Sequence, residues 1–280
     1  MNYILTSDFF ITDFVGGAAL NDEEIYKVFK ENKENITKIK TSDITEEFLE
    51  EQKDSFFIVS NFFHLKEDLK QKLSELKYAI YAHDYKFVEH TNPAVYEDFL
   101  VPKDKLINKD FFEKSLGIFC QSTFQQGIYN KNLDVLRLTL NVSGNLWPKE
   151  SFELMEEYSK KEKKNTCSVI KSRFPQKGVP ESIKFCIEKT FDYELIWDEE
   201  YHSFLRKLGS NAGLSFIPFT PETLCRAVVE AKMMNVNVFT TNMVGASYEK
   251  WFEKNGTELI EYMKGRKDYV YKRIKLIGSK

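Results

Sequence analysis

The stretch that decides the fold reads SFIPFTPETLCRAVVEAKMMNVNVFTT and covers residues 215–241. Short apolar runs at 213–218 and 236–241 are typical of buried strands, and residues 223–235 between them have the character of a helix. The stretch also holds two glutamates eight positions apart, Glu222 before the apolar run and Glu230 inside it. At 3.6 residues per turn, we expect Glu222 at the mouth of the helix and Glu230 about two turns in.

The N-terminus of such a helix is suited to bind an anion. The backbone N–H groups that follow Glu222, beginning with Thr223 and Leu224, have no partner inside the helix and point at its mouth, where a diphosphate can sit. Carboxylates accept hydrogen bonds from hydroxyl groups. Two carboxylates beside an anion hole therefore suit a sugar that is attached to a diphosphate.

The composition is that of a globular protein, with 42% hydrophobic and 30% charged residues, and 280 residues are enough for two modest domains or one large one. The net charge of −3 predicts no broad attraction to nucleic acid or membrane. No run approaches the roughly 18 consecutive apolar residues of a spanning helix, so we expect no stable membrane insertion. The N-terminus lacks the features of a signal peptide and the four cysteines are widely spaced, which together predict a cytoplasmic protein with free thiols.

Strand-like runs alternate with longer amphipathic stretches along the whole chain. The expected strands are 3–6, 56–60, 78–83, 117–121, 135–142, 166–171, 194–197, 213–218 and 236–241. The expected helices are 22–32, 66–76, 108–114, 123–130, 151–162, 180–190, 199–208 and 223–235. This alternation predicts an α/β protein with parallel sheets covered by helices on both faces. The strongest break, a Trp-Pro turn followed by a highly charged stretch, falls near residues 146–150 and divides the chain into two halves.

Two cations stand in the loop after the expected strand 166–171, which reads SRFPQKG over residues 172–178. Arg173 offers a planar fork to phosphate oxygens, and Lys177 offers a mobile point charge. The alternative is an ordinary basic surface turn.

Two further motifs follow strands of the first half. His83 opens a His-Asp-Tyr turn at the end of the strand 78–83, where a side chain is well placed to contact a ligand. Gly16 and Gly17 follow the first strand and let the backbone approach a ligand closely, although a Gly pair alone is more often just a turn.

In this order, the Gly-Gly loop, the His-Asp-Tyr turn, the Arg/Lys-Gly loop and the Glu-x7-Glu pair resemble the motifs of retaining, family-4-like glycosyltransferases (glycosyl transferases group 1). The resemblance implies the GT-B fold, in which two Rossmann-like lobes face a cleft, here in a compact version. It implies an acceptor lobe over 1–148 and a donor lobe over 149–265, with a C-terminal helix or tail, 266–280, that packs back on the first lobe. This sequence departs from the motif at Cys225, where a Gly is usual, which narrows the space for the donor.

The resemblance also implies roles for these residues. Glu222 and His83 would contact the donor sugar, and Glu230 would bind the ribose. The remaining residues would line the diphosphate, and they are Arg173, Lys177, Thr223, Leu224, Gly16 and Gly17. The implied donor is a nucleotide diphosphate sugar, with a UDP-sugar expected, and no cofactor or metal is expected because the sequence holds no Asp-x-Asp pair.

Two other functions stay open at this point. A glycoside hydrolase would use Glu222 and Glu230 as a carboxylate pair, but the loop at Arg173 would then have no purpose. A catalytically degenerate sugar-nucleotide-binding protein that pairs with an active partner fits the substitution at Cys225. The acceptor is unknown among glycans, lipid-linked sugars and modified nucleic acids, and the oligomeric state cannot be derived from the sequence.

Overall fold

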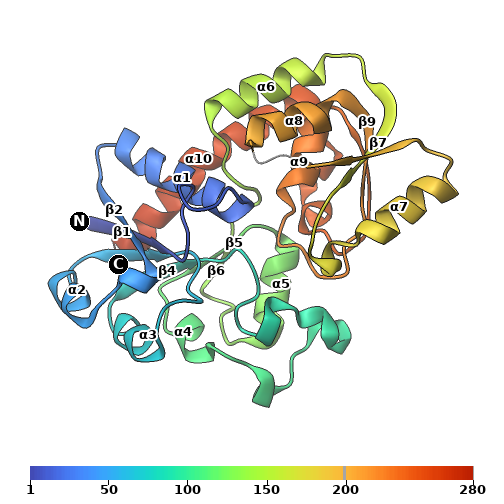
Figure 1. Ribbon diagram of the computed structural model, residues 1–280. Helices are drawn as coiled ribbons and strands as arrows, with labels where there is room; N and C mark the ends of the chain where they lie inside the picture. Colours follow the sequence, from blue (N-terminus) through green and yellow to red (C-terminus); the bar gives the residue numbers. More distant parts are fainter. Residues whose placement is uncertain (198–199, 280) are drawn as a thin grey trace. The chain divides into compact units, whose positions relative to one another are not determined.

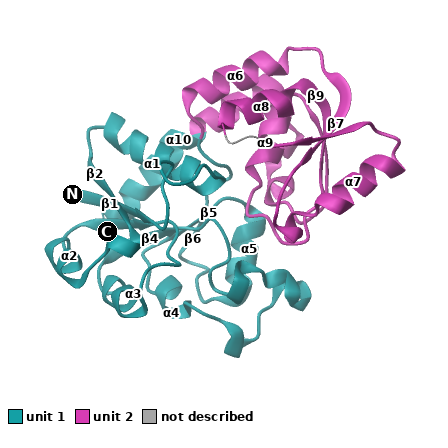
Figure 2. Cartoon of the chain, in the orientation of Figure 1, with its two compact units in different colours: residues 1–146, 266–280 teal, residues 147–265 magenta. Residues whose placement is uncertain are grey.

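The computed structural model describes residues 1–197 and 200–279, and it divides into two compact units. Unit 1 holds residues 1–146 and 266–280, and unit 2 holds residues 147–265 (Figure 2). Two predicted segments touch undescribed residues: the helix 199–208 begins on Glu199, and the tail 266–280 ends on Lys280. In the described part of the chain, no helix is long and apolar enough to cross a membrane.

Unit 1 is built on a six-stranded parallel sheet with the order β2-β1-β3-β4-β5-β6 (Figure 1). The strands are β1 (Asn2–Ser7), β2 (Asn35–Lys40), β3 (Phe56–Val59), β4 (Lys77–Tyr81), β5 (Ile118–Cys120) and β6 (Thr139–Asn141). The helices are α1 (Gly17–Glu31), α2 (Glu46–Glu51), α3 (Glu67–Leu73), α4 (Lys109–Glu113), α5 (Thr123–Asn132) and the second half of α10 (Gly256–Gly278).

Strand β1 shows how this sheet buries both faces. Tyr3 and Leu5 belong to the core that α1 and α10 cover, whereas Ile4 between them belongs to the core under α3, α4 and α5. Successive side chains of a strand point to opposite faces, so a strand covered on both sides reads as a continuous apolar run. Within this unit, Lys267 and Lys275 of α10 form ion pairs with Glu31 and Glu34, at the end of α1 and just beyond it.

Unit 2 contains a four-stranded parallel sheet with the order β10-β9-β7-β8. Its strands are β7 (Lys164–Ile170), β8 (Tyr193–Ile196), β9 (Asn211–Phe216) and β10 (Asn237–Thr240). Its helices are α6 (Lys149–Ser159), α7 (Val179–Glu188), α8 (Tyr201–Ser210), α9 (Arg226–Met233) and the first half of α10. Helix α7 packs on one face of the sheet, and α6, α8 and α9 pack on the other (Figure 1).

The two sheets share one topological feature. In unit 1 the first strand, β1, lies between the second and the third, and in unit 2 the first strand, β7, lies between β8 and β9 in the same way. The chain therefore leaves neighbouring strands in opposite directions at β1/β3 and at β7/β9. Such switch points are where open α/β sheets bind ligands, beyond the carboxyl ends of the strands.

The structure differs from the predicted elements at several places. The helix predicted over 223–235 starts only at Arg226, because Cys225 has φ 71° and ψ 86°, which interrupts helical geometry. Glu222 therefore lies four residues before α9, and Glu230 lies about one turn into it. Strand β2 and the short helix α2 were not predicted, and the strand predicted over 135–142 is confined to Thr139–Asn141.

Gly178 joins the loop after β7 to the loop after β9. It has φ 64°, and a Cβ atom added there would lie 1.7 Å from the carbonyl oxygen of Ile217. Next to this contact, the N–H of Phe219 donates to the carbonyl of Gln176 at 2.9 Å. Only glycine allows this approach in this conformation. The two loops at the switch point are therefore held backbone to backbone.

We predict that Gly178→Ala lowers the free energy of unfolding by about 2–4 kcal/mol. The reasons are the strain of a left-handed alanine and the displacement of the Ile217 backbone. Urea unfolding measures the loss. The matched control is Gly265→Ala in α10, where an added Cβ meets nothing within 4 Å. This control should be neutral or stabilising by up to about 1 kcal/mol. Equal urea midpoints for Gly178→Ala and the wild type would contradict the structural role of Gly178.

Candidate functional site

Lys177 and Glu222 meet at the switch point of unit 2. Lys177 ends the short turn Pro175–Lys177 after β7, and Glu222 lies in the loop after β9. The Lys177 Nζ donates to Glu222 Oε1 at 2.6 Å. The backbone of Glu222 is fixed on its other side, because its N–H donates to Met243 and its carbonyl accepts from Gly245. The structure thus brings together two of the residues that the sequence predicted for one site.

Glu222 stabilises the charged form of Lys177. Burial by itself lowers the pKa of Lys177, but the charge of Glu222 and the hydrogen bond from Lys177 to it together raise this pKa above its ordinary value. Lys177 is therefore a cation at neutral pH. Its side chain remains 36% exposed, against 15% for Glu222, so an incoming anion can reach it.

The segment between Glu222 and α9 offers backbone donors. Within the described residues, the N–H groups of Leu224 and Cys225 have no hydrogen-bond acceptor, whereas the carbonyls of both residues accept bonds from Ala246 and Val228. The Leu224 side chain is fully buried in the core, so only its backbone could contact a ligand. Thr223 beside it is half-buried. Burial also raises the pKa of the Cys225 thiol, which keeps that thiol protonated next to the Lys177–Glu222 pair.

Glu230 lies inside unit 2 and is engaged by the protein itself. Its Oε1 accepts from Trp147 Nε1 at 2.8 Å, from Tyr201 Oη at 2.5 Å and from Arg226 Nε at 2.8 Å. The sequence predicted Glu230 as a binding residue but missed its three partners. Only Arg226 carried a signal, because a residue four positions earlier on a helix lies on the same face.

Arg173 stands apart from the Lys177–Glu222 pair. Its guanidinium lies over the Phe174 ring, 5.2 Å from the centroid, and it lines a groove on α7 together with Ile183 and Ile187. Among the described residues, no carboxylate forms an ion pair with Arg173. The sequence placed Arg173 and Lys177 in one loop correctly, but no contact joins their side chains.

His83 lies two residues beyond β4 in unit 1, and both of its ring nitrogens have protein partners. Nε2 lies 3.0 Å from Asp22 Oδ1, and Nδ1 lies 3.1 Å from the Gln121 amide nitrogen. The second oxygen of Asp22 accepts from Ser60 Oγ at 2.6 Å. The sequence predicted His83 at the end of its strand but missed Asp22, Gln121 and Ser60.

Gly16 and Gly17 form the start of α1 in the same unit. Gly16 is the N-cap residue and Gly17 is the first residue of the helix, whose first turn carries no acidic side chain. An added Cβ at Gly17 would meet nothing within 4 Å, so the backbone there is open to close approach. Asp8, at the end of β1 nearby in the chain, accepts from the N–H groups of Phe63 and His64 and ties the β1 and β3 loops together.

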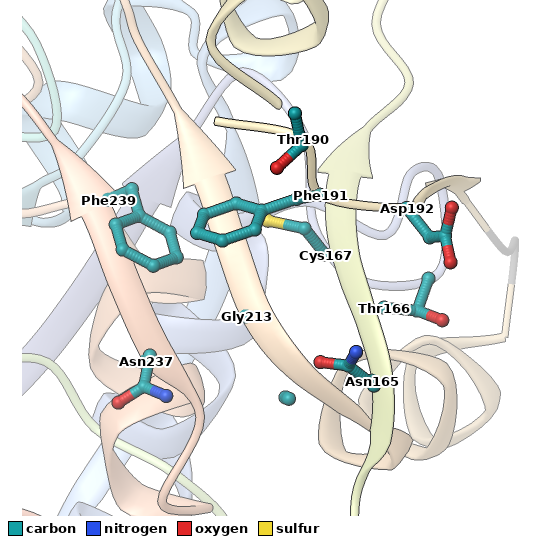
Figure 3. A pocket seen from close by; sticks show the side chains of 10 residues that line it. Asn165, Thr166, Cys167, Thr190, Phe191, Asp192, Gly213, Asn237 and Phe239 are labelled. Atoms are coloured by element: carbon teal, nitrogen blue, oxygen red, sulfur yellow. The ribbon is translucent and has the colours of Figure 1, made fainter. Parts of the chain in front are cut away.

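A small pocket in unit 2 lies at the opposite edge of the sheet. It has a volume of about 150 Å³ and is lined by Cys167, Gly213, Phe191 and Phe239, among others (Figure 3). Most of the lining residues lie in the first half of a strand or just before one. Ligand pockets usually measure about 300–1,000 Å³, so a sugar nucleotide does not fit here. The Lys177–Glu222 pair remains the candidate site, and in the described residues no group of three or more potential ligands is placed to hold a metal ion.

Neither a known sequence family nor a curated protein matches the chain. Solved structures do match. The catalytic domain of starch synthase IV from Arabidopsis thaliana, bound to ADP and acarbose, is similar over 99% of this chain and 94% of its own, with a TM-score of 0.61 and 10% identity. HepE from Anabaena in complex with UDP is similar over 100% and 98%, with a TM-score of 0.54 and 9% identity. An alpha-glucosyltransferase in complex with UDP and DNA is similar over 100% and 91%, with a TM-score of 0.50 and 11% identity.

The chain has the GT-B fold. The likeness extends over nearly the full length of both chains, so it includes both units. At such low identities the likeness establishes the fold alone, and the chemistry has to be argued from the residues of this chain.

We predict a measurable coupling between Lys177 and Glu222 of about 0.5–1 kcal/mol, the range of partly exposed ion pairs. Urea unfolding at pH 7.5 of the wild type, Lys177→Met, Glu222→Gln and the double variant gives this coupling. Because the folded pKa of Lys177 is raised, the contribution is present below the unfolded value of 10.5 and is lost as the pH rises through the folded pKa.

The matched control is the exposed pair of Lys184 and Glu188 on α7, whose charged atoms lie 3.8 Å apart. Its coupling should stay below about 0.5 kcal/mol. A Lys177–Glu222 coupling no larger than that of the control pair would show that the two side chains do not form a defined contact.

Proposed function

We propose that the protein is a glycosyltransferase that moves a sugar from a nucleotide diphosphate sugar to an acceptor hydroxyl, with retention at the anomeric carbon and without a metal. The observation that carries the proposal is the Lys177–Glu222 pair at the β7/β9 switch point. The pair places a cation that can bind a diphosphate beside a carboxylate that can accept hydrogen bonds from sugar hydroxyls. Solved structures of the same fold are bound to UDP or ADP, which supports a nucleotide as the ligand of this chain.

In this proposal the leaving diphosphate is held by Lys177, by the N–H groups of Leu224 and Cys225, and by the dipole of α9. Arg173 supplies a second cation from the same loop. Glu222 binds hydroxyls of the donor sugar, and its contact with Lys177 gives way in part when the diphosphate arrives. The donor is a UDP-sugar, and Glu230 binds its ribose.

Unit 1 would contribute His83 to the donor sugar, with Asp22 and Gln121 fixing the ring. Gly16 and Gly17 would let the backbone approach the phosphate or the acceptor. The acceptor hydroxyl loses its proton to the leaving phosphate in this scheme, so neither Glu222 nor Glu230 acts as a nucleophile.

The contacts of Glu230 weigh against a glycoside hydrolase. A hydrolase needs Glu222 and Glu230 to act as a pair on one glycosidic bond, whereas Glu222 is paired with Lys177 and Glu230 Oε1 already accepts from three internal donors. A sugar-nucleotide-binding protein without turnover is the second candidate. Cys225 favours this candidate. Its backbone is left-handed, a conformation that glycine adopts without strain, and glycine would also leave more room for a donor than the thiol side chain does.

We predict that UDP, at 100 times its Kd, raises the stability of the wild type by about 2.7 kcal/mol, which a thermal shift detects. Lys177→Ala should weaken UDP binding by roughly tenfold or more, because one charge-assisted contact to the diphosphate is lost. Lys184→Ala on α7 is the matched control and should bind UDP as the wild type does.

No shift of the folded wild type with UDP, ADP or GDP would overturn the donor site. Binding of a nucleotide together with release of UDP from UDP-glucose in the presence of an acceptor supports the transferase. Binding without turnover across glycan, lipid-linked and nucleic-acid acceptors supports the binding protein.

A further inference from the structure

The small pocket of unit 2 exists because a glycine interrupts one row of side chains in the sheet. Cys167 on β7, Gly213 on β9 and Asn237 on β10 are partners in the strand register, so these three positions lie in one row on the same face. Gly213 has no side chain, and the row is open at its middle. The resulting space measures about 150 Å³, and cavities of about this size accommodate one six-membered ring.

One side of this pocket is an aromatic wall. Phe191 comes from the segment between α7 and β8 and Phe239 comes from β10, and their rings lie side by side with centroids 5.3 Å apart and planes inclined by 36° (Figure 3). Phe185 of α7 packs against both rings, with centroids 6.3 and 5.2 Å away. Phe191 is still 39% exposed. The wall is therefore fixed by packing and remains accessible to a ligand.

Two side-chain amides border the same pocket. Asn165 of β7 and Asn237 of β10 are exposed residues that lie on either side of β9 (Figure 3). Neither side chain forms a hydrogen bond with another residue in the described part of the chain. An amide offers both an NH₂ donor and an acceptor oxygen. The two amides are therefore suited to bind hydroxyl groups, which donate and accept as well.

The pocket carries little charge. Among the described residues that line it, Asp192 alone has a charged side chain. Burial raises the pKa of the Cys167 thiol to about 12, so this thiol is neutral at physiological pH. A phosphorylated ligand would meet a carboxylate and no cation, and like charges repel. The lining therefore favours an uncharged ligand that has an apolar face and several hydroxyl groups.

We infer that this pocket is a second carbohydrate site, which binds one pyranose ring of a neutral saccharide. The C–H groups on one face of the sugar ring lie against Phe191 and Phe239, because the negative face of an aromatic ring attracts polarised C–H groups. The sugar hydroxyls bind to the amides of Asn165 and Asn237 and to the carboxylate of Asp192.

This inference goes beyond the proposed function and does not depend on it. The pocket lies toward the amino ends of the strands, whereas Lys177 and Glu222 follow the carboxyl ends of β7 and β9. A saccharide in the pocket therefore takes no part in the transfer of a sugar. It gives the protein a separate point of attachment, which raises the local concentration of a glycan that is bound there.

The test is an NMR titration of ¹⁵N-labelled protein with methyl α- and β-D-glucopyranoside, maltotetraose, cellotetraose and chitotetraose. At least one saccharide should bind with a Kd of about 10 mM or lower and shift the side-chain amide signals of Asn165 and Asn237. Phe191→Ala and Asn237→Ala should each weaken this binding by about three- to tenfold, through the loss of an aromatic contact or a hydrogen bond. Because Asn237 is exposed, its variant tests the site even if Phe191→Ala does not fold.

Phe219→Ala is the matched control. Phe219 is 51% exposed, belongs to the same unit and does not line the pocket, so the saccharide affinity of this variant should equal that of the wild type. Uridine and adenosine are titrated in parallel, as ligands with a base but no phosphate. Calorimetry with UDP reports on the donor site separately, and Phe191→Ala and Asn237→Ala should bind UDP as the wild type does.

The outcomes separate this inference from the proposed function. If the folded wild type binds UDP but no saccharide, the inference is overturned and the donor site stands. Saccharide binding that is unchanged in both pocket variants places the sugar elsewhere and also overturns the inference. A nucleoside that binds more tightly than every saccharide, and loses affinity in the pocket variants, assigns the pocket to a base instead. Saccharide binding that is weakened in the pocket variants, without any nucleotide binding, supports the inference and removes the proposed function.

Discussion

The candidate site depends on one backbone contact, that of Gly178 with the carbonyl of Ile217. Strands β7 and β9 are neighbours in the sheet, but α7, β8 and α8 separate them in the chain. Their loops leave the switch point in different directions, and a side chain at Gly178 would force them apart. The contact places Lys177, the residue before Gly178, within reach of Glu222, five residues after Ile217. The lack of a side chain at Gly178 thus determines that Lys177 and Glu222 meet at this edge of the sheet.

Two ion pairs lie on either side of the start of α9, and their surroundings give them different roles. The pair of Lys177 and Glu222 is partly exposed, so an anion can compete for the lysine. The pair of Arg226 and Glu230 is almost completely buried, and the guanidinium is stacked on two aromatic rings. Removing a ligand-accessible charge pair costs little, whereas separating a buried pair is expensive. The exposed pair is therefore suited to exchange partners on binding, and the buried pair is suited to stay as it is.

The fold was predictable because its signal is local. Apolar runs such as 56–60 alternate with amphipathic stretches. This alternation of strand-like and helix-like segments by itself indicates parallel sheets. Strand β2 was missed because Asn35–Lys40 lies at the sheet edge and carries lysines, so its composition resembles a loop. The predicted start of α9 was wrong because Cys225 adopts a left-handed conformation, which the local sequence pattern does not predict. The order of the motifs located Lys177 and Glu222 in one region. It could not find Asp22 or Trp147, which reach His83 and Glu230 across 61 and 83 positions of the chain.

The contacts of His83 narrow what chemistry unit 1 can contribute. The amide nitrogen of Gln121 is only a donor, so His83 Nδ1 accepts, and Nε2 then carries the hydrogen that Asp22 receives. Asp22 is itself fixed by Ser60, and the His83 ring cannot turn without breaking its contacts with both Asp22 and Gln121. With both nitrogens occupied, His83 is poorly placed to take a proton from an acceptor hydroxyl. In a transferase built this way, the proton has to leave by another route, and the strongest acceptor in the reaction is the diphosphate that departs from the donor sugar. The same arrangement explains why the cations and N–H donors of unit 2 matter most, because the negative charge gathers on that diphosphate as the sugar leaves.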